Sequence, residues 1–299
     1  MDKGLVDGRV VVVTGAGRGI GRAHALAFAA EGARVVVNDI AVQRSAVGPA
    51  HQVVEEITAA GGEAVVNGDD IADWDGANSL IQSAVDTYGG LDVLVNNAGF
   101  IRGSELVDTG EAEWDAVVRV HLKGHFATLR HAAQYWRGQT KLGAAVDARI
   151  INTSSAAGLQ GSFGQGNYSA AKAGITALTL VAAVELGRYG VTVNAIAPTA
   201  RTRMTDTAFA QSMARPDDDS FDAMAPANIS PLVVWLGSAE SRDITGKVFE
   251  VEGGQIRIAE GWAHGPQIDK DARWNPTELG PVIDDLLAKS RQPIPVYHP

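Results

Sequence analysis

The chain has 299 residues, of which 45% are hydrophobic and 20% charged, and it carries a net charge of −10. A chain of this length and composition is expected to fold as a compact α/β domain rather than stay disordered. The acidic balance, with no run of Lys or Arg, argues against a nucleic-acid binder. The lack of cysteine excludes disulfides, thiolate catalysis and cysteine-ligated zinc.

Membrane and metal chemistry are not expected either. The first residues are polar, so no signal peptide is predicted, and no apolar run reaches the roughly 20 residues that span a bilayer. His121 and His125 lie one helical turn apart, but Leu122 stands where a zinc protease carries Glu. We therefore expect a cytoplasmic protein with no metal site.

Short β-branched runs alternate along the chain with longer alanine-rich segments of helical period. Strands are predicted at 10–13, 34–38, 63–66, 93–96, 149–153, 191–196 and 248–251, and helices at 22–31, 52–60, 77–88, 111–136 and 167–188. Strands that are apolar on both faces, each followed by a helix, indicate an α/β fold with a doubly wound parallel sheet of Rossmann type. It would occupy residues 1–259 as one dinucleotide-binding and catalytic domain with helices on both faces of the sheet.

The first predicted strand leads into a glycine-rich turn, which is followed by a helix. Its sequence is TGAGRGIG at 14–21. Glycines let the backbone turn sharply and approach a pyrophosphate, and the positive end of the next helix then faces that anion. The turn therefore predicts a dinucleotide site, with cofactor contacts from Gly15, Arg18, Gly19, Ile20 and Gly21.

The second predicted strand ends at Asp39. A carboxylate at this place accepts hydrogen bonds from the adenine-ribose hydroxyls and repels a 2′-phosphate. Arg18 favours the opposite outcome, because a basic side chain in the glycine turn can meet a 2′-phosphate. Since the carboxylate would lie directly on the ribose, we expect the cofactor to be NAD.

Tyr168 and Lys172 lie four residues apart near the start of a predicted helix and so share one face. A tyrosine with a pKa near 10 is a poor base at neutral pH, and a lysine cation one turn away favours the phenolate. Ser155 follows the fifth predicted strand, where its hydroxyl could hold a substrate oxygen. Together these residues predict proton exchange with an alcohol or a ketone.

The composition changes near residue 260, where a proline-rich tail begins. Within it, apolar residues recur at helical spacing, namely Leu279, Val282, Ile283, Leu286 and Leu287. We expect residues 260–299 to be an extension that packs on the core or on a neighbouring subunit, because an exposed amphipathic helix is an aggregation liability.

Four motifs resemble the short-chain dehydrogenase/reductase family over about residues 8–254: the glycine turn, NNAG at 96–99, Ser154-Ser155, and YSAAK at 168–172. The resemblance implies Ser155, Tyr168 and Lys172 as the catalytic triad, with Lys172 also binding the nicotinamide ribose. It places Asn97, Ala98 and Gly99 beside the cofactor, Asp70 and Ile71 beside the adenine, and Pro198 and Thr199 at the nicotinamide. It also implies a homo-dimer or homo-tetramer.

One position departs from the family pattern. His121 stands where the family usually carries an asparagine that supports the proton relay. A neutral imidazole also donates and accepts hydrogen bonds, so we expect His121 to lie near Lys172 and to support that relay. Because histidine titrates near neutrality, oxidation is expected to fall below about pH 6.5 as His121 becomes protonated.

With His121, the segments FGQGN at 163–167 and PLVVWL at 231–236 narrow the resemblance. They are similar to the (3R)-hydroxyacyl-CoA dehydrogenase unit of the peroxisomal multifunctional enzymes type 2 and its free-standing bacterial relatives. This implies oxidation of (3R)-3-hydroxyacyl-CoA to 3-oxoacyl-CoA in fatty-acid or steroid side-chain degradation. The CoA phosphates would need cations, for which Arg102, Arg201 and Arg203 are candidates.

Two alternative functions stay open. The first is a hydroxysteroid or other secondary-alcohol dehydrogenase that acts on a free substrate. The second is a non-catalytic nucleotide-binding regulator on the same fold, since a fold alone does not define function. A regulator has no need of Ser155, Tyr168 and Lys172 together, so the intact triad argues against it.

Overall fold

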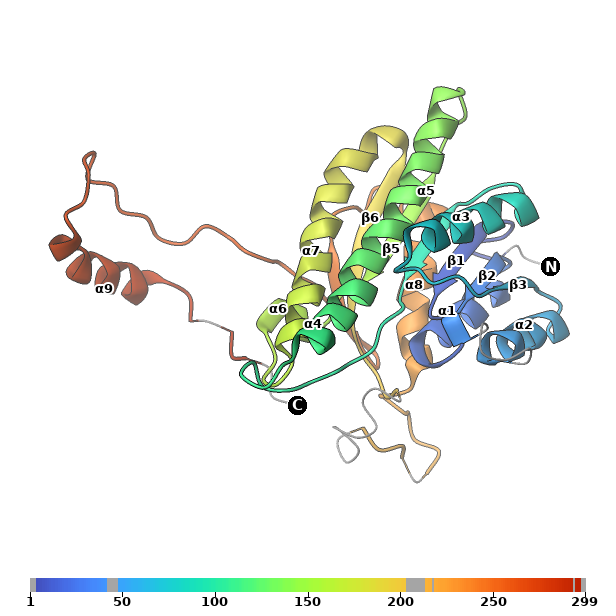
Figure 1. Cartoon of the computed structure of the whole chain (residues 1–299), viewed down its shortest axis with the longest axis horizontal. Helices are drawn as coiled ribbons and strands as arrows, with labels where there is room; N and C mark the ends of the chain where they lie inside the picture. Colours follow the sequence, from blue (N-terminus) through green and yellow to red (C-terminus); the bar gives the residue numbers. More distant parts are fainter. Residues whose placement is uncertain (1–3, 42–47, 203–212, 217, 293, 297–299) are drawn as a thin grey trace.

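The computed structural model describes residues 4–41, 48–202, 213–216, 218–292 and 294–296. The described strands form one eight-stranded sheet in the order β3-β2-β1-β4-β5-β6-β7-β8 (Figure 1). The pairs from β3 to β7 are parallel, and only β8 runs antiparallel, against β7. The strands are β1 Val10–Thr14, β2 Arg34–Asn38, β3 Glu63–Asn67, β4 Val93–Asn96, β5 Ala148–Thr153, β6 Val191–Thr199, β7 Val248–Glu252 and β8 Gln255–Ala259.

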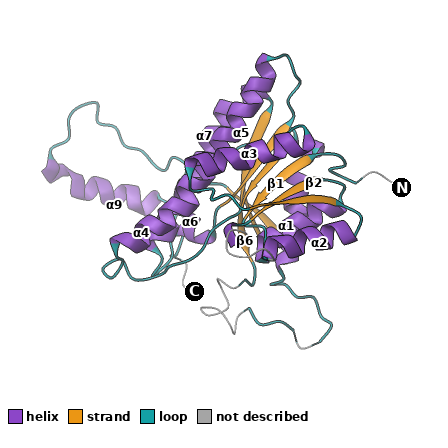
Figure 2. Ribbon diagram, turned by 45° about the vertical axis from the view of Figure 1, so that its right-hand side comes forward, coloured by secondary structure: helices purple, strands orange, loops and turns teal. Residues whose placement is uncertain are grey.

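Helices cover both faces of the sheet, as Figure 2 shows. One core joins the sheet to α1, α2 and α8, and a second core joins it to α3, α5 and α7. The α-helices are α1 Gly19–Ala30, α2 Pro49–Ala59, α3 Trp74–Tyr88, α4 Glu111–Val118, α5 Gly124–Lys141, α6 Ala156–Gln160, α7 Gly166–Leu186, α8 Ser230–Leu236 and α9 Leu279–Lys289.

Alternate residues of the central strands enter the two cores. In β1, Val11 and Val13 pack in the core that holds Phe28 of α1, whereas Val10 and Val12 pack in the core that holds Leu80 of α3. A strand buried on both faces reads as a continuous apolar run, which confirms the predicted parallel sheet. The strand order reverses between β1 and β4, and ligands of such sheets bind at the carboxyl ends of the strands at that point.

Two elements differ from the prediction. The helix expected at 111–136 is divided, because a π-helical turn, η2 Arg119–Lys123, separates α4 from α5. The spacing of apolar residues could not reveal this turn, because a π-helical turn adds only one residue to an otherwise regular helix. The strand β8 was not predicted, because its side chains lie on an exposed edge and carry no buried pattern.

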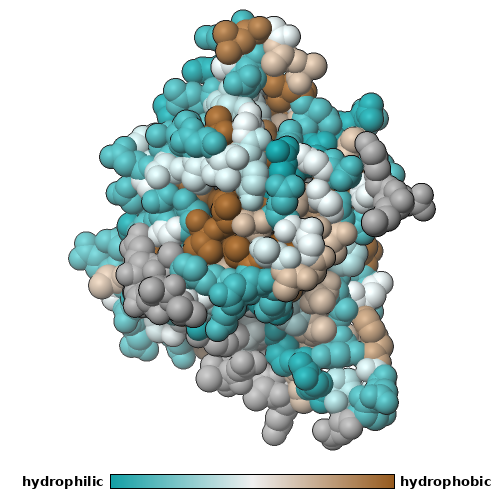
Figure 3. Space-filling model, turned by 90° about the vertical axis from the view of Figure 1, so that its right-hand side faces the viewer, coloured by the Kyte–Doolittle hydropathy of each residue, from teal (hydrophilic) through white to brown (hydrophobic). Residues whose placement is uncertain are grey.

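Among the described residues, α7 with the turn after it is the only helix long and apolar enough to cross a bilayer. It packs against α6 and β6 and contributes Ile175 and Leu186 to the buried interior. Its other face is exposed at Leu180, Val181 and Val184, so only part of the apolar surface of α7 belongs to the core. On the face drawn in Figure 3, hydrophilic side chains surround a central apolar patch, and further apolar side chains lie at the upper end.

The tail extends away from the body of the chain, and α9 is held apart from the sheet in Figure 1. No residue of α9 is buried, and Ile283 and Leu287 are 46% and 62% exposed. Trp262 near the start of the tail is fully exposed. Since α9 does not pack on the core of its own chain, we propose that it packs on a second copy.

Replacing Leu287 with Asp is expected to lower the mass of the assembly or its solubility, because a charge would enter the proposed contact. Light scattering coupled to gel filtration measures this. Asp284→Ala, on the same helix and also exposed, is the matched control and is expected to leave the mass unchanged. An unchanged mass in both variants, and in a chain that ends at residue 260, would contradict the proposed packing.

Candidate active site

One cavity of about 550 Å³ lies at the carboxyl ends of the central strands. Every residue predicted for cofactor binding or catalysis lines it: Gly15, Arg18, Gly19, Ile20, Gly21, Asp39, Asp70, Ile71, Asn97, Ala98, Gly99, His121, Ser155, Tyr168, Lys172, Pro198 and Thr199. The cavity wall also includes residues that were not predicted as site residues, among them Phe100, Ile101, Arg119, Thr153 and Gln165.

The glycine turn fits a dinucleotide. Gly15 has φ +62°, and a Cβ on it would lie 2.7 Å from the Cα of Ala98. A Cβ on Gly21 would lie 2.3 Å from the carbonyl oxygen of Gly15. No side chain caps the start of α1, so the first N–H groups of that helix remain available to an anion. These are the features that a pyrophosphate requires.

Thr14 and Asn97 hold the two sides of this cradle together. The Thr14 hydroxyl accepts hydrogen bonds from the N–H groups of Asn97 (2.9 Å) and Ala98 (3.1 Å). The Asn97 amide donates to the carbonyl oxygen of Thr14 at 2.9 Å. Thr14 was not predicted as a site residue, although its place at the head of the glycine motif is a signal that could have identified it.

The Asp39 carboxylate is fixed beside the glycine turn. Its Oδ2 accepts from the N–H of Gly17 at 3.1 Å, and its Oδ1 accepts from the N–H of Ala41 at 2.9 Å. A Cβ on Gly17 would lie 2.6 Å from Oδ2. Arg18 lines the same cavity with an exposed side chain. Both groups of opposite charge are therefore near the place where an adenine ribose is expected.

Asp70 and Ile71 line another part of the cavity. Asp70 accepts a hydrogen bond at 2.7 Å from the guanidinium of Arg119, the first residue of η2. This ion pair is partly exposed, so its contribution to stability is small. It ties the loop after β3 to the helix that carries His121.

Tyr168 and Lys172 come from the first turns of α7, as predicted. The Lys172 ammonium is buried, donates to the carbonyl oxygen of Thr153 at 2.6 Å and lies 5.5 Å from the centre of the Tyr168 ring. Burial lowers the pKa of Lys172 to about 7. Burial also raises the pKa of Tyr168 above its usual value of 10, and a hydrogen bond with the Ser155 side chain opposes that rise.

These pKa directions differ from the expectation that Lys172 lowers the pKa of Tyr168. The reason is that both groups are removed from water, which penalises the phenolate and the ammonium alike. In the chain alone, Tyr168 is therefore a proton donor at neutral pH. Ser155 is the neighbour that brings its pKa down.

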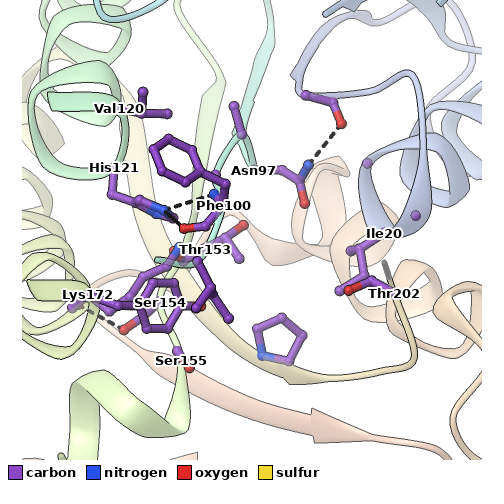
Figure 4. Close-up of a pocket in the computed structure, with 18 of the residues that line it drawn as sticks. Ile20, Asn97, Phe100, Val120, His121, Thr153, Ser154, Ser155, Lys172 and Thr202 are labelled. Carbon is purple, nitrogen blue, oxygen red and sulfur yellow. Dashed lines mark hydrogen bonds between the residues drawn. The ribbon is translucent and has the colours of Figure 1, made fainter. Parts of the chain in front are cut away.

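His121 is buried in η2 and packs on the loop after β4, as Figure 4 shows. Its Nε2 lies 3.0 Å from the backbone nitrogen and 2.7 Å from the carbonyl oxygen of Phe100. The ring meets Tyr168 edge-on at 5.2 Å, and a Cβ on Gly99 would lie 2.2 Å from its Cε1. His121 therefore connects the loop after β4 to Tyr168.

The predicted pH dependence from His121 is wrong, because the buried ring does not titrate near neutrality. Burial first, and the charge of Lys172 second, lower the pKa of His121 to about 3. The ring therefore stays neutral at every pH at which the enzyme would be assayed. The predicted loss of oxidation below pH 6.5 does not follow, because the unperturbed histidine value does not apply to a buried ring.

The candidate cations for a CoA phosphate have different surroundings. Arg201 forms an ion pair with Asp222. Arg102 is exposed and stacks over the ring of Phe100 at 5.4 Å from its centre. Arg203 lies outside the described residues. Among the residues that the structure describes, no group of three His, Asp or Glu side chains could hold a metal ion.

The doubly wound sheet and the triad beside a dinucleotide cradle define an oxidoreductase that binds a nicotinamide nucleotide. Residues 9–214 match the model of the short chain dehydrogenase family, and the chain belongs to that family.

The chain is also similar to individual proteins of this family. The chain is 47% identical over 292 residues to the hydroxyacyl-CoA dehydrogenase ChsB1 of Mycobacterium tuberculosis, a match that covers 95% of this chain and 90% of that protein. It is 42% identical to peroxisomal multifunctional enzyme type 2 of Mus musculus over 84% of this chain, but the match spans only 32% of that longer protein. A crystal structure of a short chain dehydrogenase from Mycobacterium avium superposes with a TM-score of 0.91 at 70% identity, covering 98% of this chain and 99% of that one. The predicted family and fold are thereby confirmed.

Ser155→Ala should move the acid limb of alcohol oxidation to higher pH, because the hydrogen bond that lowers the pKa of Tyr168 is lost. Oxidation needs the deprotonated tyrosine, so a higher pKa leaves less of it at a given pH. The pH dependence of kcat measures the shift, which should be about one unit for the loss of one strong hydrogen bond. A lower kcat with an unmoved limb would assign Ser155 to substrate placement alone.

His121→Asn should keep most of the activity, because the amide offers a donor for the carbonyl oxygen and an acceptor for the N–H of Phe100, of which the ring Nε2 serves one, according to its tautomer. His121→Leu should lose about tenfold or more in kcat/KM, since the Phe100 backbone group that the ring bonds then loses its partner. Steady-state rates of both variants at pH 6 and pH 8 are the measurement. Equal rates in the two variants would show that the ring only fills space.

Proposed function

We propose that this enzyme oxidises (3R)-3-hydroxyacyl-CoA to 3-oxoacyl-CoA with NAD, in the degradation of fatty acids or steroid side chains. The observation that carries the proposal is the match to a hydroxyacyl-CoA dehydrogenase over nearly the whole of both chains. It is supported by the cavity in which Ser155, Tyr168 and Lys172 meet the dinucleotide cradle.

The proposed chemistry assigns one proton and one hydride. Ser155 holds the C3 hydroxyl, and Tyr168 takes its proton as the hydride leaves C3. NAD, when bound, supplies the hydride acceptor, so the products are the 3-oxo thioester, NADH and a proton. Lys172 is assigned to hold the nicotinamide ribose and to balance the charge of the phenolate, for which its ammonium is suitably placed 5.5 Å from the tyrosine ring.

The decisive experiment compares NAD reduction with 3-hydroxyacyl-CoAs of both C3 configurations, free hydroxysteroids and simple secondary alcohols. The (3R) thioesters are expected to be the best substrates by kcat/KM. Tyr168→Phe should abolish turnover but keep NAD binding, because it removes the proton acceptor and leaves the cradle intact. A preference for free steroids would replace the proposal with the alternative dehydrogenase. Retention of activity within about tenfold in Tyr168→Phe would remove Tyr168 from the chemistry.

NAD is proposed over NADP because Asp39 is held in place by two backbone N–H groups. Asp39→Ala should weaken NAD binding and narrow its advantage over NADP, since a ribose contact and the repulsion of a 2′-phosphate are lost together. Ratios of kcat/KM for the two cofactors measure this. Arg18→Ala is the partner variant and should keep NAD preferred, because it removes the cation that would favour a 2′-phosphate. A wild-type enzyme that prefers NADPH would show that Arg18 decides the choice.

We further propose that the enzyme works in the cytoplasm as a homo-dimer or homo-tetramer. The exposed apolar side chains of α9 and of Trp262 support an assembly in which the tail contacts a second copy. No nucleic acid or membrane partner is proposed.

A further inference from the structure

Asn167 is a buried amide at the start of α7, directly before Tyr168. It is the last residue of the segment FGQGN at 163–167, and the proposed reaction gives it no role. Only 1% of Asn167 is exposed, and it is not among the described residues that line the cavity. Any effect of its side chain on the chemistry must therefore pass through its neighbours.

The Asn167 amide forms hydrogen bonds at both of its polar atoms. Its Oδ1 accepts from the N–H of Tyr168 at 2.7 Å, and its Nδ2 donates to the carbonyl oxygen of Arg102 at 3.0 Å. The same Nδ2 lies 3.5 Å from the carbonyl oxygen of Glu113 in α4, a longer and weaker contact. One N–H and two carbonyl oxygens around the amide determine its orientation. Asn167 thereby joins the start of α7 to the loop after β4, residues 97–110.

The bond to Tyr168 satisfies a backbone group that the helix itself leaves open. The first N–H groups of an α-helix have no partner within the helix. Tyr168 lies in the first turn of α7, and Gln165, which precedes that helix, makes no side-chain cap. The Oδ1 of Asn167 supplies the acceptor instead. This bond fixes the backbone from which the phenol of Tyr168 extends.

The loop after β4 also touches the residues before α7 directly. Ser104 pairs with Gln165 in an isolated parallel bridge. A Cβ on Gly103 would lie 2.9 Å from the carbonyl oxygen of Gly164, which is too close for a side chain to fit without movement of the backbone. The two segments are therefore packed against each other, and the buried amide of Asn167 bonds to both.

The same loop forms cavity wall next to Tyr168. Phe100 and Ile101, immediately before Arg102, line the cavity. The backbone of Phe100 is bonded to the His121 ring, which meets the Tyr168 ring at 5.2 Å. The position of this wall relative to the phenol therefore depends on how the loop is held against α7.

We propose that Asn167 is a positioning residue that couples this cavity wall to Tyr168. Its bond to Arg102 holds the wall of Phe100 and Ile101 at one distance from the phenol, where the substrate is oxidised. Its bond to the N–H of Tyr168 holds the phenol itself. The inference rests on the proposed acid–base role of Tyr168. It separates two effects, because the loop acts on substrate binding and the tyrosine backbone acts on turnover.

Two variants of Asn167 divide these effects. Asn167→Asp keeps the acceptor for Tyr168 but turns the donor into an oxygen, which the Arg102 carbonyl oxygen repels. The KM of the alcohol substrate should rise roughly three- to tenfold, while kcat on its high-pH plateau stays within about twofold. The plateau is compared because a carboxylate near Tyr168 would raise the pKa of the phenol. Asn167→Ala removes both bonds, so it should raise KM and lower the plateau kcat together.

Asn194→Asp is the matched control. Asn194 is buried in β6, where its Nδ2 donates to the carbonyl oxygen of Ile244 at 2.7 Å and its Oδ1 accepts from the N–H of Lys247 at 3.0 Å. It has the same kinds of bonds but is not among the described residues that line the cavity. The control should lower the melting temperature and leave KM unchanged. An equal rise of KM in both Asp variants, or an unchanged KM in a folded Asn167→Asp protein, would overturn the proposal.

A plateau kcat that falls as far in Asn167→Asp as in Asn167→Ala would also overturn it, because the two bonds would then have no separate effects. If Asn167→Asp does not fold, Gly103→Ala decides. Its Cβ must push the loop away from the Gly164 carbonyl oxygen, so KM should rise in the same way. An unchanged KM in Gly103→Ala would then reject the coupling.

Backbone hydrogen exchange in the protein without substrate separates this inference from the proposed function. Asn167→Asp should speed the exchange of residues 100–108. The Kd of NAD should stay unchanged, since Asn97 and Ala98 are held by Thr14. Faster exchange without turnover of acyl-CoA substrates would reject the substrate and keep the coupling, with KM then measured for the alcohol that is oxidised. Turnover of acyl-CoA substrates with unchanged exchange would reject the coupling alone.

Discussion

The burial of the Lys172 ammonium is the constraint on which the rest of the site depends. Only 3% of this residue is exposed, and an unpaired charge in such a place is costly. The carbonyl oxygen of Thr153 satisfies one donor, and the Ser154 hydroxyl donates to the carbonyl oxygen of Lys172 at 3.0 Å, which fixes α7 against the end of β5. The lowered pKa of Lys172 is the consequence of this burial. Because the pKa of Lys172 lies near neutrality, small changes around the ammonium alter the fraction of it that is charged. The residues packed against Lys172 therefore affect its protonation state.

A buried polar network supports the same region from beneath. The Thr128 hydroxyl donates to Asn96 Oδ1 at 2.7 Å, the Asn96 amide donates to Asn152 at 3.0 Å, and the Asn152 amide donates to Thr179 at 2.9 Å. The chain of bonds crosses from α5 through β4 and β5 to α7. Because buried polar groups are costly when unpaired, the network defines how the two helices sit on the sheet. It accounts for polar residues in strands that are otherwise apolar.

The parallel sheet was predictable because β1, β2 and β4 are apolar on both faces, and their ends were placed within a residue. The glycine turn, Asp39 and YSAAK were predictable because local order along the chain places them at strand ends and helix starts. Contacts between distant segments were not. Nothing in the sequence shows that Thr14 binds the loop after β4 or that burial outweighs Lys172 in setting the pKa of Tyr168. The tail was predicted to pack on the core or on a neighbouring subunit; no residue of α9 is buried in the chain itself, and packing on a second copy stays a proposal.

The π-helical turn at Arg119–Lys123 carries one residue more than an α-helical turn would need. Each residue of an α-helix adds about 100° of rotation, so the turn sets the faces of α4 and α5 against each other by about that angle. Deleting a single residue within it would straighten the helix without removing any catalytic group. The ring of His121 would then leave Phe100, and α4 would present another face to the start of α7. The number of residues in this turn thus determines which side chains of the two helices face the active site.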